Sequence, residues 1–224
     1  MQKPEILSPN TSSHYNALQE LNLKTKWLTE ITSRALLGYH TATKHDAVNA
    51  AGTYAYFAAI KAVRDILVPQ GWEIHREHNL EMTRYCQTGT ILIISSGNEL
   101  TGIHGKKNPK TRNHKGTQTQ KAVDRNHEQL YLWPELQERP ITSKINKDLG
   151  SSWILLYYVD SKNSEMRSEL SLPISIDPKE LRVDNWQTRI ILPPVKFDHE
   201  PINPDQEREY APDMDITIKR RINE

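Results

Sequence analysis

The sequence predicts an α+β fold in which two N-terminal helices pack on one face of a mostly antiparallel sheet. Three observations support this prediction: a helical apolar stripe over residues 15–37, small residues over 44–67, and strand-like patterns after Gly71. Helices followed by a run of strands are typical of α+β domains rather than of alternating α/β units. With 224 residues, 36% of them hydrophobic, the chain can form one large domain.

Composition divides the chain into three parts. Residues 1–13 contain two prolines and an Asn-Thr-Ser-Ser cluster, which predicts a flexible lead-in ending in a helix cap. Residues 14–195 are the predicted single α+β domain. Residues 196–224 are the predicted irregular C-terminal arm, because residues 196–215 hold seven acids, two basic residues and three prolines. Residues 216–222 could pair as a short final strand.

Two patterns predict the helices. Residues 15–37 carry an apolar stripe at helical spacing, interrupted at Thr25, and Gly38 is the predicted end of this helix. Residues 44–67 contain seven alanines and one glycine. Because small side chains let helix backbones approach closely, the second helix is predicted to be central and tightly packed.

Five segments are predicted to contain strands. Residues 72–82 alternate between two faces, which indicates a half-exposed strand or a hairpin. Residues 90–95 (TILIIS) and 153–159 (WILLYYV) are apolar on both faces, so we expect them in the middle of the sheet. Residues 167–174 and 189–192 are bounded by prolines, as strand ends and edges often are.

The bulk composition limits the class of protein. A formal net charge of +1 argues against a protein that is basic throughout, so any nucleic-acid binding must be local. The single cysteine, Cys86, excludes an intramolecular disulfide and a cysteine-based zinc site, and it fits a reducing compartment. No apolar run approaches the roughly 20 residues of a membrane helix. The N-terminus lacks the apolar region of a signal peptide, so we expect a soluble, cytoplasmic protein with no membrane partner.

Residues 104–125 concentrate positive charge, with seven lysines and arginines against one acid, Asp124. Such asymmetry indicates an interaction rather than a folding requirement. The segment follows the polar turn at 95–102, whose backbone N–H groups could form an anion-binding nest. We therefore predict a long basic loop that binds phosphate together with this turn; the alternative is a solvated loop that only maintains solubility. The predicted phosphate-binding residues are Ser96, Gly97, Asn98, Lys106, Lys107, Lys110, Arg112, His114, Lys115 and Lys121.

These residues favour a non-enzymatic protein whose loop engages nucleic-acid phosphate or an acidic protein surface. The rival is a metal-dependent nuclease or phosphodiesterase, in which Asp160 and Glu169 hold Mg²⁺ or Mn²⁺ and His104 contacts the phosphate. No other cofactor is predicted, since the G-x-x-x-x-G-K-[ST] and G-x-G-x-x-G patterns are absent. A third alternative is a structural or adaptor subunit that docks on a protein partner through the small-residue helix and the proline-rich arm.

Overall fold

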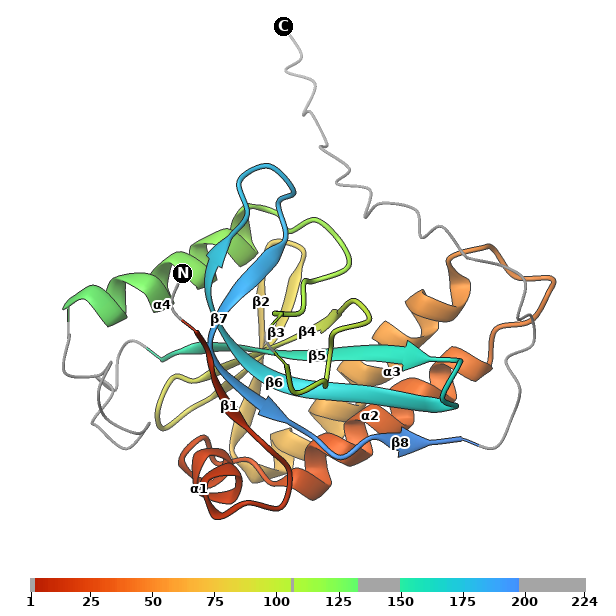
Figure 1. Cartoon of the computed structure of the whole chain (residues 1–224), viewed down its shortest axis with the longest axis horizontal. Coiled ribbons are helices and arrows are strands. Elements are labelled where there is room, and N and C mark those ends of the chain that lie inside the picture. Colours follow the sequence, from red (N-terminus) through yellow and green to blue (C-terminus); the bar gives the residue numbers. More distant parts are fainter. Residues whose placement is uncertain (1–2, 106, 133–149, 198–224) are drawn as a thin grey trace, which may run out of the picture.

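The computed structural model describes residues 3–105, 107–132 and 150–197 (Figure 1). Its helices are α1 (Ser12–Glu20), α2 (Thr25–His40), α3 (Ala50–Leu67), the 3-10 turn η1 (Val68–Gln70) and α4 (Thr117–Leu132). Its strands are β1 (Glu5–Leu7), β2 (Trp72–Glu77), β3 (Leu80–Tyr85), β4 (Ile91–Ser96), β5 (Ser152–Asp160), β6 (Glu165–Ile176), β7 (Val183–Ile191) and β8 (Val195–Lys196). Lys106, the acidic segment from residue 198 onward and the predicted strand at 216–222 lie outside the described residues.

The strands form one mixed sheet in the order β1-β7-β6-β5-β4-β3-β2, and β8 also pairs with β6. β1 runs parallel to β7 and β4 runs parallel to β5, whereas all other paired strands are antiparallel. The predicted α+β class with a mostly antiparallel sheet is therefore confirmed. The segment predicted as a half-exposed strand or hairpin is the β2–β3 hairpin, which turns at His78 with φ at +55°.

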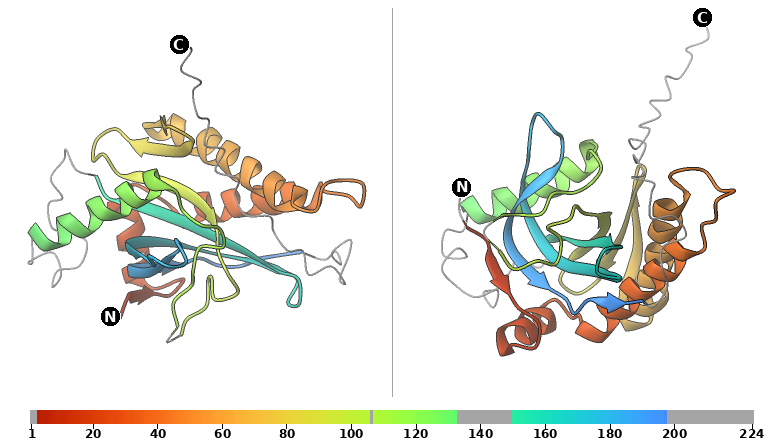
Figure 2. Two further views of the ribbon diagram at one scale, coloured as in Figure 1. Left: turned by 90° about the horizontal axis from the view of Figure 1, so that it is seen from above. Right: turned by 45° about the vertical axis from the view of Figure 1, so that its right-hand side comes forward.

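Helices cover both faces of this sheet. On one face, α1, α2 and α3 pack against alternate side chains of β4 and β5, among them Leu92 and Trp153. On the other face, Ala122 and Val123 of α4 pack with Ile154 and its neighbours. Figures 1 and 2 show α2 and α3 on one side of the sheet and α4 on the other. Successive residues of a strand point to opposite faces of the sheet. The two segments predicted to be central, now β4 and β5, therefore pack against helices on both faces.

The prediction of a single helix over residues 15–37 is wrong, because the chain forms α1 and α2 with a turn between them. Asn22 lies in this turn with φ at +53°, a left-handed conformation that asparagine tolerates better than most residues. Leu21 and Leu28 are both buried and lie two helical turns apart, so the apolar spacing continues across the break and conceals it. The predicted helix cap is confirmed, since the Thr11 side chain accepts a backbone N–H of the first turn of α1.

Gly38 does not end α2, which continues to His40. A Cβ atom added at Gly38 would lie 2.6 Å from the Cβ of Ala58 and 2.7 Å from the carbonyl oxygen of Tyr54. The glycine therefore lets the backbones of α2 and α3 approach closely. Ala55 of α3 is fully buried, as are several other alanines, so the predicted tight packing of the small-residue helix is confirmed.

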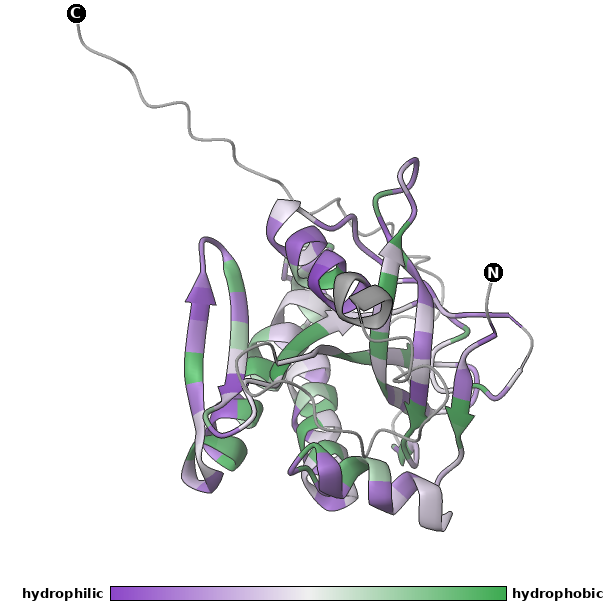
Figure 3. Ribbon diagram, turned by 90° about the vertical axis from the view of Figure 1, so that its left-hand side faces the viewer, coloured by the Kyte–Doolittle hydropathy of each residue, from purple (hydrophilic) through white to green (hydrophobic). Residues whose placement is uncertain are grey.

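The sequence predicted neither β1 nor α4. Residues 5–7 of the predicted lead-in form β1 and pair with β7. Residues 117–125 of the predicted basic loop begin α4, which is largely hydrophilic (Figure 3). Its apolar stripe is too short to give a periodic signal, because Ala122 and Val123 are its buried hydrophobic residues in the part whose side chains are described. Among the described residues, no helix is both long and apolar enough to cross a membrane.

Candidate phosphate-binding surface

The basic loop (residues 104–116) is held against the end of β4. Gly97 and Thr111 form an isolated antiparallel bridge. Around this bridge the Asn98 N–H donates to the Lys110 carbonyl at 3.0 Å, and the Arg112 N–H donates to the Ser96 carbonyl at 2.9 Å. The Lys110 N–H donates to Oδ1 of Asn98 at 3.1 Å. These hydrogen bonds fix the backbone of the three residues centred on Thr111.

A second set of contacts joins the same loop to the β6–β7 hairpin. The Thr111 N–H donates to the Val183 carbonyl at 2.9 Å, and the Val183 N–H donates to Oγ1 of Thr111 at 3.1 Å. Nε1 of the buried Trp186 donates to the Pro109 carbonyl at 2.8 Å. The Lys115 N–H donates to the carbonyl of Leu181 at 2.6 Å. The basic loop is thus anchored on two sides and is not a solvated coil along residues 109–115.

Several backbone N–H groups of the turn at 95–102, proposed as an anion nest, already have acceptors in the protein. The Gly97 N–H donates to the Tyr157 carbonyl at 2.8 Å, and the Thr101 N–H donates to the Asn98 carbonyl at 2.9 Å. The Gly102 N–H donates to Oε2 of Glu169 at 2.8 Å. Binding of phosphate at this surface would therefore depend chiefly on side chains.

The basic side chains of the loop differ in how accessible they are. His104, Lys107 and His114 are exposed, whereas Arg112 and Lys115 are partly buried. Lys121 is exposed on α4, just beyond the end of the loop. The structure therefore brings Ser96, Gly97 and Asn98 next to the middle of the loop and places Lys121 on a separate element.

Two of the predicted lysines have partners within the protein. Nζ of Lys110 lies 2.9 Å from Oε2 of Glu180, and this hydrogen bond raises the pKa of Lys110. Nζ of Lys115 donates to Oγ of the buried Ser95 at 2.7 Å. Both lysines keep a defined orientation, which reduces the side-chain entropy that a ligand would have to overcome.

The charges of two arginines act on Tyr158, a feature that the sequence did not reveal. Burial is the main cause of the raised pKa of Tyr158, and the charge of Asp160 adds to it, while Arg112 and Arg167 oppose the rise. Arg167 lies over the Tyr158 ring at 5.2 Å from its centroid, and its Nη2 donates to the Glu99 carbonyl at 2.9 Å. Arg167 of β6 therefore contacts the turn that precedes the basic loop, while its charge is balanced by Asp160.

The two carboxylates considered as metal ligands are separated and already bonded. Asp160 accepts hydrogen bonds from the N–H groups of Lys162 and Asn163 and forms an ion pair with Arg167 at 3.1 Å. In the pairing of β5 with β6, Asp160 lies opposite Glu165 and Glu169 lies opposite Leu156. Four residues along a strand correspond to about 13 Å. Within the described ranges, no three His, Cys, Asp or Glu side chains are grouped so that they could hold a metal.

Glu169 belongs to a fully buried ion pair. Its carboxylate accepts from Arg189 at 2.9 Å (Nε to Oε1) and 2.6 Å (Nη2 to Oε2), and from the Ser171 hydroxyl at 2.7 Å. Arg189 also donates to the Ile103 carbonyl at 3.1 Å. Together with the Gly102 N–H, these bonds tie the start of the basic loop to β6 and β7. No sequence signal singled out this pair, because β6 and β7 contain other charged and polar residues as well.

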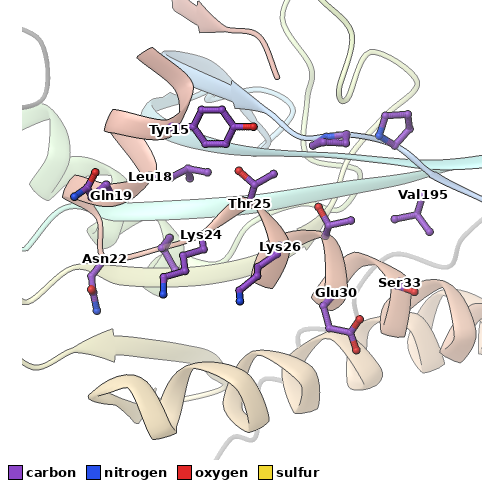
Figure 4. Close-up of a pocket in the computed structure, with 14 residues that line it drawn as sticks. Tyr15, Leu18, Gln19, Asn22, Lys24, Thr25, Lys26, Glu30, Ser33 and Val195 are labelled. Atoms are coloured by element: carbon purple, nitrogen blue, oxygen red, sulfur yellow. The ribbon is translucent and has the colours of Figure 1, made fainter. Parts of the chain in front are cut away.

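A separate open groove of about 970 Å³ lies between α1, the start of α2 and the segment before β8 (Figure 4). Tyr15, Leu18 and Pro194 line its apolar part. Its charged lining residues are Lys24, Lys26 and Glu30. None of these residues was predicted to be functional, because the groove joins segments far apart in the sequence.

In comparisons with protein-family models, curated proteins and solved structures, nothing matches this chain.

Proposed function

We propose that this chain is a non-enzymatic binding protein that engages nucleic-acid phosphates through the basic loop. The observation that carries the proposal is the anchoring of this charged loop to both β4 and the β6–β7 hairpin. A solvated loop that only maintains solubility does not need such anchors. A loop whose backbone is fixed before binding loses less conformational entropy when a ligand arrives.

The charges suit a phosphate backbone. Lys107, Arg112 and Lys121 are at least partly exposed and are carried by the loop and by α4. Arg112 has a planar guanidinium that can bind phosphate oxygens through two hydrogen bonds. Neutralising phosphates releases condensed counterions, so the affinity should fall steeply with salt. The single cysteine, Cys86, fits a cytoplasmic setting for this activity.

The test is fluorescence anisotropy of the full chain with labelled duplex DNA, single-stranded DNA and RNA at about 50 and 200 mM salt. We expect salt-sensitive binding that is weakened in Lys107→Glu/Arg112→Glu. Losing two phosphate contacts should reduce the slope of log affinity against log salt by about 2. The corresponding change between the two salt concentrations is roughly tenfold.

Lys61→Glu is a single charge reversal that serves as a control, because Lys61 is 76% exposed and lies on α3, on the opposite face of the sheet from α4. It should leave the affinity unchanged. Absence of wild-type binding to every nucleic acid at low salt would refute the proposal and favour an acidic protein surface or an adaptor role. Cleavage of these nucleic acids with Mg²⁺ or Mn²⁺, abolished by Asp160→Ala, would instead support the nuclease alternative.

A further inference from the structure

α4 is attached to the sheet along one narrow side. Thr119, Ala122, Val123 and Asn126 are buried. Nδ2 of Asn126 donates to the Ser152 carbonyl at 2.8 Å and to the Pro173 carbonyl at 2.9 Å. Its Oδ1 accepts the Ser152 N–H at 2.8 Å. These three bonds fix the position of α4 on β5 and β6.

The outward side of α4 carries polar groups of several kinds. Gln120, Lys121, Asp124 and His127 are exposed, and their spacing places them on a common side of the helix. This set contains both donors and acceptors, whereas the basic loop is predominantly cationic. Base edges in DNA present donors and acceptors, and phosphates require positive charge. The polar side chains of α4 therefore suit the base edges of a duplex, and the basic loop suits its phosphates.

The connection between them is short. Lys115 of the basic loop is followed by Gly116 and then by the first residue of α4, and the Gln120 N–H donates to the Gly116 carbonyl at 3.2 Å. Arg125 lies 3.7 Å from Glu77 at the tip of the β2–β3 hairpin. The helix thus continues directly from the anchored loop, and an ion pair on its flank links it to this hairpin. Figure 1 shows α4 at the margin of the molecule.

We infer that α4 enters the major groove of B-form duplex DNA while the basic loop contacts the adjacent phosphates; this inference rests on the proposed nucleic-acid binding. With its side chains an α-helix is about 10–12 Å wide, and the major groove of B-DNA is about 12 Å wide. The 16 residues of α4 span about 24 Å, enough to follow the groove over several base pairs. Duplex RNA is disfavoured because its major groove is deep and narrow.

Asp124 distinguishes the outward side of α4 from the predominantly cationic basic loop. A carboxylate on the outward side of α4 would be repelled by phosphates, yet it can accept a hydrogen bond from the amino group of cytosine. Gln120 can pair with adenine and Lys121 with guanine. The outward side of α4 therefore has the chemistry to distinguish base pairs.

The experiment is selection of the full chain on random-sequence duplex DNA at moderate salt, followed by affinity measurements on enriched and scrambled duplexes. Wild type should enrich particular sequences. Gln120→Ala/His127→Ala leaves the formal charge unchanged and should reduce the preference for the enriched duplex at least tenfold, with the affinity for the scrambled duplex and the salt slope retained. His45→Ala/Gln70→Ala is the matched control at exposed sites elsewhere and should keep the preference.

The outcomes separate this inference from the proposed function. Salt-sensitive wild-type binding without sequence enrichment, or equal affinity for duplex RNA or single strands, would overturn the role of α4 and leave phosphate binding intact. A preference that survives Gln120→Ala/His127→Ala, or that is lost equally in the control, would also overturn it. Absence of binding to any nucleic acid would overturn both.

Discussion

Glu169→Gln tests how much the buried ion pair with Arg189 contributes to the stability of the fold. Both side chains are fully buried, and two hydrogen bonds join them directly. The substitution keeps the size of the side chain but removes the charge that balances the guanidinium. It also replaces one carboxylate oxygen with an amide N–H₂ group, which cannot accept a hydrogen bond from the donors around it, those of Arg189, Ser171 and the Gly102 N–H.

The expected loss in unfolding free energy is large. Removing one partner of a buried ion pair leaves an uncompensated charge and costs about 3–5 kcal/mol. A domain of this kind is stable by only about 5–15 kcal/mol. In Glu169→Gln/Arg189→Met no buried charge remains, and the oxygen of the introduced amide can still accept the Gly102 N–H. The remaining cost is mainly the Ile103 carbonyl without its donor, about 1–3 kcal/mol.

Urea unfolding of the wild type and the two variants measures these differences. With a slope of about 1–3 kcal/mol per molar urea, Glu169→Gln should lower the midpoint by roughly 2 M. Glu30→Gln is the control, because the Glu30–Arg34 pair is about half exposed and should contribute at most about 0.5 kcal/mol. If Glu169→Gln cost no more than this control, or if the double variant were less stable than Glu169→Gln alone, the reasoning about the buried pair would be refuted.

Two further predictions concern the fold. Gly38→Ala should destabilise the protein by about 1–3 kcal/mol, because its new Cβ would overlap Ala58 and the backbone of α3. Gly105→Ala is the control, because no other atom lies within 4 Å of a Cβ added at Gly105, and it should change the melting temperature little. Equal melting temperatures of the two variants would contradict the close contact of α2 and α3. Burial lowers the pKa of His14 below 6.5, so its contribution to stability is present above this pH and is lost as the pH falls through the folded-state pKa. In His14→Gln the unfolding free energy should therefore decrease less steeply below about pH 6.5 than in the wild type. If the difference in unfolding free energy between the variant and the wild type were the same at every pH, this prediction would be contradicted.

Local patterns were sufficient where a residue's role depends on its neighbours in the sequence. The strands β4 and β5 follow from doubly apolar runs, and the close packing of α3 follows from its alanines. The break at Asn22 was missed because Leu21 and Leu28 preserve the helical spacing across it. α4 was missed because tertiary burial, here through Ala122 and Val123, outweighs a weak local signal.

For the candidate surface, charge was visible in the sequence but geometry was not. Seven lysines and arginines within residues 104–125 indicated an interaction surface. The spatial arrangement of these side chains depends on the pairing of Thr111 with Gly97 and Val183, and no local sequence pattern encodes these contacts. The sequence also singled out Asp160 and Glu169 as polar groups near the ends of core strands, but it could not show that arginines already occupy them.

The sequence by itself determined the α+β class, the buried centre of the sheet and the concentration of charge, because these follow from hydrophobic periodicity and composition along short segments. Only the tertiary structure decided which polar groups meet. Strand register places Glu169 beside Arg189, 20 residues further along the chain, and their hydrogen bonds connect the basic loop to the sheet. Long-range pairing sets whether a carboxylate is bonded or free to bind a ligand, and this pairing is a property of the folded chain as a whole.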